Sequence, residues 1–276
     1  MTTHIGRSVW AAGSVCAAAL SLTSCQGAGF SAEVTARAKT VAAEADAAQL
    51  SAHVTALVKT REQETAVPSP FWGDMPLRRR NAASYIDSYW KGLGLTVQHE
   101  RELQNQIETE NLFVDLPGRS ADLVLVSGHY DNWHLGADDN ASAVAILLET
   151  ARILRPLKLS RTVRIIAFDR EEEGLIGSDR YARAHVGETI AGIINMDCVG
   201  YASRAPGSQS APPGLALRSV GDFLAIIASD ASAELLSSVT KLSTELPHPP
   251  NVLGLVAPGN GHNAAGAAFL RSDHAA

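Results

Sequence analysis

The stretch of sequence that decides the fold runs from residue 123 to residue 172 and reads LVLVSGHYDNWHLGADDNASAVAILLETARILRPLKLSRTVRIIAFDREE. Two short apolar runs with strand character, Leu123 to Val126 and Val163 to Phe168, enclose a largely apolar helical stretch from Asn140 to Leu154. Asp139 and Asn140 are expected to cap the start of that helix. Strand, helix and strand in this order predict a parallel sheet.

Ionisable residues follow each apolar run at the point where the predicted strand stops. The first run leads to His129, the second to Glu171 and Glu172, and a third run, Ile190 to Met196, ends at Asp197. In open α/β sheets ligands bind beyond the carboxyl ends of the strands, where loops from neighbouring strands converge. We therefore expect the functional site at this edge of the sheet.

Bulk composition limits the classes of protein and partner. With 276 residues and 46% hydrophobic content, the chain can form one sizeable α/β domain. A formal charge of −6 argues against a nucleic-acid groove, which needs a strongly basic face. The arginine run Arg78, Arg79 and Arg80 is interpreted as the solvated start of a helix that ends near Gly92 and Gly94.

The first 25 residues have the pattern of an export signal. Arg7 gives a positive start, Val9 to Leu22 is apolar, and the sequence Leu22-Thr23-Ser24-Cys25 follows. This ending resembles the lipobox of bacterial lipoproteins, which implies lipidation of Cys25 and removal of residues 1–24. The alternative is an ordinary secretory signal with a chance cysteine.

The resemblance to a lipoprotein signal also implies a domain organisation and a location. A signal peptide would span 1–24, a tether 25–48 and a catalytic domain 49–276. The protein would be extracytoplasmic and lipid-anchored to a bacterial membrane, and Gln26 after the lipidated cysteine suggests the outer membrane where one exists. Cys198 would then be the one cysteine besides Cys25 in the mature chain, so an intramolecular disulfide has no partner, and we expect Cys198 to be buried.

The ionisable residues near the strand ends can be considered as one set. Its members are His129, Asp131, Asp138, Asp139, Glu171, Glu172, Asp197 and His274. Several carboxylates in one cleft repel one another unless a cation neutralises them, so we expect a metal site. Imidazole and carboxylate ligands without a thiolate suit catalytic zinc, although cobalt or manganese could substitute. Asp131, two residues after His129, could accept the proton of its far ring nitrogen and fix its tautomer.

Five segments, in this order, resemble metallopeptidase family 28, the co-catalytic zinc aminopeptidases of bacterial leucyl aminopeptidase type. The segments are GHYDNW, GADDNAS, FDREEEGLIGS, NMDCVG and RSDHAA, and they cover the chain from Gly128 to its end. The resemblance implies a three-layer αβα fold around a mixed, mostly parallel sheet. It also implies hydrolysis of peptides that have a free N-terminus.

The resemblance assigns roles residue by residue. His129 and Asp197 would bind one Zn²⁺, Glu172 and His274 the other, and Asp139 would bridge the two ions, with a cis peptide bond between Asp139 and Asn140. Glu171 would be the general base, and Glu171 and Asp131 are the candidate catalytic residues.

Two departures from the family pattern qualify these expectations. Ala143 and Cys198 stand where the family has glycine and a bulkier aliphatic residue or methionine. The chain stops two residues after His274, whereas family members continue with a further strand and helix, so we expect a domain that is incomplete at its C-terminus.

Two rival functions stay open at this point. A glutaminyl-peptide cyclotransferase of the same fold would use a single zinc ion. A non-catalytic surface module would keep the fold and is expected to lose metal ligands, and none of the ligand positions is lost here.

Overall fold

The computed structural model describes residues 15, 30–62, 75–210, 218–246, 249–257 and 273. Cys25, His274 and almost all of the expected signal peptide lie outside these residues. Within the part of the chain that is described, none of the helices combines the length and apolar character needed to cross a membrane.

The centre of the fold is a five-stranded sheet in the order β1-β2-β4-β3-β5. Its strands are β1 (Gln98–Gln104), β2 (Ile107–Leu116), β3 (Gly118–His129), β4 (Leu159–Phe168) and β5 (Ile190–Asn195). Strand β3 pairs in parallel with β4 and β5, whereas β2 runs antiparallel to both β1 and β4. Four strands therefore point the same way and β2 opposes them, which confirms the expected mixed, mostly parallel sheet.

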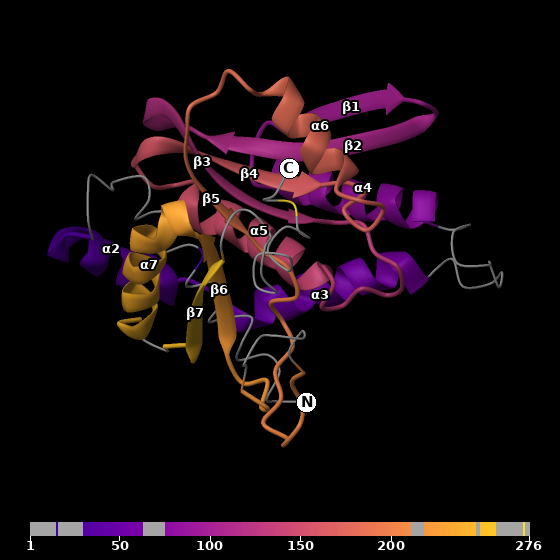
Figure 1. Ribbon diagram of the computed structural model, residues 1–276. Helices are drawn as coiled ribbons and strands as arrows, with labels where there is room; N and C mark the ends of the chain where they lie inside the picture. The colour runs from indigo at the N-terminus through magenta and orange to yellow at the C-terminus, as the bar shows by residue number, and fades with distance from the viewer. Residues whose placement is uncertain are drawn as a thin grey trace.

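Helices cover both faces of this sheet and complete the expected three layers (Figure 1). The helices are α3 (Ala47–Glu62), α4 (Met75–Gly92), α5 (Ala141–Leu154) and α6 (Ile176–Ala184). Helix α5 packs on β3 and β4, α4 packs on β2, and α3 packs outside them against α4 and α5. Helix α6 lies on the other face, where its Tyr181 packs with Phe113 of β2 and Phe168 of β4.

Alternation of side chains along the strands creates these two cores. In β3, Val124 and Val126 belong to the large core shared with α4 and α5, while Leu123 and Leu125 belong to the core beneath α6. Trp90 of α4 is fully buried in the large core.

Arg79 of α4 departs from the expectation drawn from the arginine run. Its side chain is buried, whereas Arg80 is exposed as expected for a solvated helix face. The interpretation of a solvated run is therefore wrong for Arg79.

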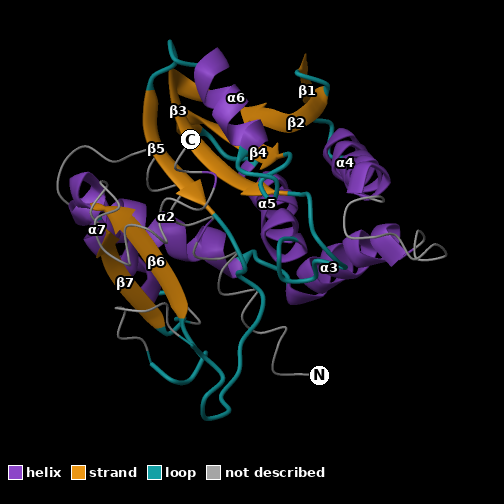
Figure 2. Cartoon of the chain, turned by 45° about the vertical axis from the view of Figure 1, so that its right-hand side comes forward, coloured by secondary structure: helices purple, strands orange, loops and turns teal. Residues whose placement is uncertain are grey.

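A smaller unit lies beside the main sheet (Figure 2). Strands β6 (Leu224–Ser229) and β7 (Val252–Ala257) form a separate parallel pair covered by α7 (Ala233–Thr244). Helix α2 (Ala32–Ala43) places Ala38 and Ala42 against Leu242 and Leu246 at the end of α7. This part of the stretch expected to be a tether is therefore packed structure, because its small side chains allow two helices to meet.

Candidate metal centre

The carboxyl ends of β3, β4 and β5 bring the predicted site residues together. In the sheet register His129 lies opposite Phe168 of β4, and Ser127 lies opposite Asn195 of β5. The residues that follow β4 and β5, Glu171 and Asp197, therefore begin at the same edge as His129.

The imidazole of His129 is the centre of this group. Its Nε2 atom lies 3.3 Å from Asp139 Oδ1, 3.8 Å from Glu171 Oε2 and 3.8 Å from Asp197 Oδ1. The ring is 1% exposed, and Nε2 has no hydrogen-bond partner among the described residues. Ligand atoms of His129, Glu171 and Asp197 lie within 4.8 Å of one another, and those of Asp139, Asp197 and Cys198 do so as well.

This donor set suits a divalent cation. A buried nitrogen that faces three carboxylates and makes no hydrogen bond is a position at which a metal cation can bind the lone pair of the neutral ring. Imidazole and carboxylate donors are those of catalytic zinc sites. The described residues therefore fit the metal that the sequence predicts.

The raised pKa values of the cluster also indicate a site for a cation. Burial raises the pKa of Glu171 to about 8, and the negative charges of Asp273 and Asp197 add to this. Burial and the charge of Asp139 raise the pKa of Glu172 to about 7. Burial alone would lower the pKa of His129, but the surrounding carboxylates outweigh it and raise the pKa well above its ordinary value. Without a cation, the group therefore binds protons to relieve its repulsion.

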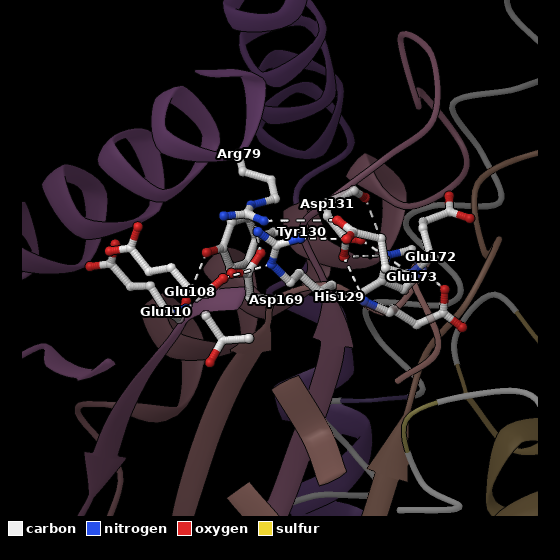
Figure 3. A network of polar contacts seen from close by, with 12 residues as sticks. Arg79, Glu108, Glu110, His129, Tyr130, Asp131, Asp169, Glu172 and Glu173 are labelled. Carbon is white, nitrogen blue, oxygen red and sulfur yellow. Dashed lines mark hydrogen bonds and ion pairs between the residues drawn. The ribbon is translucent and has the colours of Figure 1, made fainter. Parts of the chain in front are cut away.

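Asp131 holds both His129 and the loop after β4 (Figure 3). The Nδ1 atom of His129 lies 3.2 Å from the backbone oxygen of Asp131 and 3.4 Å from its Oδ1. With the proton on Nδ1, the hydrogen bond goes to the backbone oxygen, and Nε2 is left to face the cluster. The carboxylate instead accepts the N–H groups of Glu171 at 3.0 Å and Glu172 at 3.1 Å. Asp131 thus ties the β3 and β4 ends together, a role that the sequence did not suggest.

The start of α5 brings Asp139 to the cluster without the expected capping contacts. Asn140 occupies the N-cap position but makes no side-chain capping bond, and its Nδ2 donates to the backbone oxygen of Met196 at 3.0 Å. Asp139 turns its carboxylate toward His129. The expected capping position is confirmed for Asn140, and it is wrong for Asp139, which precedes the N-cap.

The peptide bond between Asp139 and Asn140 is cis, as the family resemblance implies.

Asp138 accepts the N–H groups of Gly200 and Tyr201 through Oδ1, at 2.7 and 2.9 Å. Asp138 and Asn140 therefore join the start of α5 to the residues after β5.

The last predicted ligands are placed only in part. Glu172 is half-buried within the electrostatic reach of Asp139, and His274 lies outside the described residues. Its neighbour Asp273, which the sequence interpretation left out, is buried, and burial raises its pKa to about 7. The charges of His129 and Asp197 also act on Asp273, so the chain next to His274 reaches the cluster.

A cavity of about 290 Å³ opens beside Asp197, between the residues after β5 and the β6–β7 unit. Its lining includes Asp197, Cys198, Tyr201, Phe223 and Asn251. Cys198 is a free, exposed cysteine. The expectation of a buried Cys198 is wrong, because its left-handed backbone, at φ 50°, places the residue on the cavity wall instead of in the core.

Comparison with known proteins finds a family to which part of the chain is similar. Residues 111–239 match the profile of Peptidase family M28. Over this segment the chain is similar to that family. A curated relative, Aminopeptidase YwaD of Bacillus subtilis (strain 168), is 35% identical over 99 residues, which cover 33% of this chain and 22% of the relative. Uncharacterized protein YfbL of Escherichia coli (strain K12) is 28% identical over 188 residues, 62% of this chain and 58% of that protein. The chain thus spans less than two thirds of either relative.

Solved structures share the fold of this chain. A leucine aminopeptidase precursor from Bacteroides thetaiotaomicron matches with a TM-score of 0.57 and 15% identity, over 83% of this chain and 80% of that chain. A glutaminyl cyclase from the same organism matches with a TM-score of 0.57 and 15% identity, over 83% of this chain and 79% of that chain. At this identity the likeness concerns the fold, which both kinds of enzyme use.

Proposed function

We propose that this chain is a zinc-dependent aminopeptidase that hydrolyses N-terminal residues from peptides. The observation that carries the proposal is the buried Nε2 of His129, which makes no hydrogen bond among the described residues and faces three carboxylates at 3.3 to 3.8 Å. Repulsion within such a group is relieved by divalent cations.

Two zinc ions per chain are proposed, held as the family resemblance implies. His129 and Asp197 would hold one, Glu172 and His274 the other, and Asp139 would contact both. When bound, zinc supplies Lewis-acid chemistry, which acidifies water and polarises a carbonyl group.

Glu171 is the proposed general base. Its carboxylate is 12% exposed and lies beside His129, while Asp131 fixes its backbone through a hydrogen bond to N–H. Glu171 would take the proton of the attacking water and pass it to the leaving amine. The cavity beside Asp197 gives the first residue of the substrate a place to bind.

The match to Peptidase family M28 and the curated aminopeptidase relative support this function. Measurement of zinc content together with activity tests it. The chain from residue 26 onward is purified, its zinc-to-protein ratio is measured, and its hydrolysis of aminoacyl fluorogenic substrates is followed with and without a chelator. We expect two zinc ions and activity that the chelator removes. A zinc-loaded protein that cleaves none of a panel of aminoacyl substrates would overturn the proposal.

A glutaminyl-peptide cyclotransferase is the second candidate, because a glutaminyl cyclase shares the fold as closely as the aminopeptidase precursor does. One zinc ion per chain at full occupancy, with cyclisation of an N-terminal glutamine peptide, would favour it. Two zinc ions with release of free amino acids would exclude it.

Export and a lipid anchor on Cys25 are also proposed, with support from the sequence alone. Cells that express the full chain are labelled with radioactive palmitate. We expect label on the wild-type protein and none on Cys25→Ala, and label on both would refute lipidation at Cys25.

A further inference from the structure

Arg79 of α4 makes contacts that connect it to the metal centre from behind. Its Nε lies 3.0 Å from Asp169 Oδ1, and its Nη1 lies 3.9 Å from Glu173 Oε1. The side chains of Arg79 and Asp169 are 9% and 0% exposed, so this ion pair lies in the protein interior. Figure 3 shows Arg79 and Asp169 next to Tyr130 and Asp131, on the side of His129 away from Glu172.

Asp169 is the first residue after β4 and anchors the start of the loop that carries Glu171 and Glu172. Its Oδ2 accepts the N–H of Glu110 at 3.0 Å, and its own N–H donates to Asn111 Oδ1 at 3.1 Å. The Asn111 side chain also donates to the backbone oxygen of Gly177 at 2.9 Å, beyond the far end of the loop. Strand β2 therefore holds both ends of this loop.

The loop adopts a backbone that its sequence does not favour by itself. Arg170, Gly174 and Leu175 have φ values of 55°, 107° and 60°, in the left-handed region that arginine and leucine rarely enter. Such conformations persist only where surrounding contacts fix them. The contacts on this loop include those of Asp131, Asp169 and Asn111, and two of these three residues are acidic groups without exposure.

The two acidic anchors oppose each other electrostatically. Burial raises the pKa of Asp169 to about 7, the guanidinium of Arg79 lowers it, and the charge of Asp131 raises it. If the cationic side chain of a buried ion pair is removed, the acidic partner is left with an uncompensated charge. The structure relieves this charge by protonation or by movement of the acidic side chain. Movement of Asp169 would displace the loop close to Glu171, because Asp169 lies only two residues before it.

We propose that Arg79 is a positioning residue whose buried ion pair with Asp169 holds the loop after β4, and with it Glu171 and Glu172, in the arrangement that the metal centre needs. The inference rests on the proposed function, because Glu171 and Glu172 matter for catalysis only if that function is right. Arg79 itself touches neither the cluster around His129 Nε2 nor the cavity, so its effect passes through Asp169.

The test compares three variants of the whole chain. Arg79→Met removes the charge and keeps much of the side-chain volume, Arg79→Lys keeps the charge without the planar fork, and Arg80→Met is the matched control on the exposed side of the same helix. Hydrogen exchange of amides 170–175 is measured by mass spectrometry, together with kcat, KM and zinc content.

For Arg79→Met we expect exchange over 170–175 to be at least about tenfold faster. We expect kcat to fall about 10- to 100-fold while KM changes less than about threefold, as for groups that orient catalytic residues. Arg79→Lys should lie between Arg79→Met and wild type in both measurements, and Arg80→Met should match wild type.

Wild-type exchange over 170–175 in a folded Arg79→Met protein would overturn the proposal, as would an unchanged kcat. If Arg79→Met does not fold, Arg79→Lys decides, and wild-type values of both exchange and kcat in that variant would overturn it. A wild-type protein that is inactive on aminoacyl substrates would refute the proposed function alone, since the exchange measurement still reports whether Arg79 holds the loop.

Discussion

Zinc binding to the metal-free protein should release more than one proton per chain at pH 7. Without a cation, Glu171 has a pKa of about 8 and Glu172 of about 7, and the pKa of His129 is raised well above its ordinary value. These groups therefore carry protons at pH 7 that a bound dication expels: His129 and Glu172 must be deprotonated as ligands, and the positive charge of the cation lowers the pKa of the neighbouring Glu171.

The size of the release follows from these pKa values. At pH 7 a group with a pKa of 8 is about 90% protonated and one with a pKa of 7 about half protonated, so Glu171 contributes roughly 0.9 proton and Glu172 roughly 0.5. The raised pKa of His129 adds to this release, because its imidazole must be neutral to bind the metal. The release from the glutamates falls as pH rises, because at pH 9 both have already lost most of their protons, and zinc then binds more tightly.

Isothermal titration calorimetry in buffers of different ionisation enthalpy measures the number of protons. The informative variant is Glu171→Gln, in which the release at pH 7 should fall by roughly 0.9 proton. Its zinc content should stay at the wild-type value, while kcat falls about 10²- to 10⁴-fold, because the residue transfers protons and does not bind the metal. Release of fewer than one proton by the wild-type protein, or loss of zinc from Glu171→Gln, would refute the reasoning.

Three further perturbations test the neighbourhood of His129. Asp139→Asn should lower zinc content at both positions, because this carboxylate lies 3.3 Å from His129 Nε2 and is proposed to contact both ions; elemental analysis that finds full zinc would contradict the assignment. Methyl methanethiosulfonate should lower activity by narrowing the cavity that Cys198 lines, and only slowly at pH 7, because partial desolvation of the sulfur at the cavity wall and the charges of Asp197 and Asp139 raise the pKa of the thiol, although the residue is exposed. Cys198→Ala should resist the reagent, and equal inhibition of this variant would exclude the thiol as the target. Gly128→Ala should lower the free energy of unfolding by about 1–3 kcal/mol in urea titrations, because the new methyl would lie 3.1 Å from the Ala143 Cβ and the backbone oxygen of Met196. Ala143→Gly should restore part of that loss, and no recovery would place the clash elsewhere.

The elements that sequence analysis could predict are those whose own residues are buried. Strands β3, β4 and β5 and helix α5 were expected within a few residues of their bounds, because each is a continuous apolar run with ionisable or turn residues after it. Strand β1, QHERELQ, was missed because an exposed edge strand has no apolar alternation. Charged pairs across to β2 support it instead, such as Arg101 with Glu110.

The same distinction applies to the site. His129, Asp139, Glu171 and Asp197 could be predicted as neighbours because each follows a strand or precedes a helix of the same sheet edge. Arg79 and Asp273 could not, since their burial depends on partners about 90 and 100 residues away in the sequence, Asp169 for Arg79 and the cluster around Glu171 for Asp273.

The register of β3 links the core to the metal centre. Val124 and Val126 face α5, so the odd-numbered positions 123, 125 and 129 face the opposite side of the strand. If β3 slipped by one residue against β4, Val124 and Val126 would face away from α5. The same slip would turn His129 away from Glu171 and Asp197. Selection for a buried core at Val124 and Val126 therefore fixes the direction of the His129 ring as well. A pattern of apolar residues, none of which has a reactive side chain, was therefore enough to predict where the imidazole and the carboxylates meet.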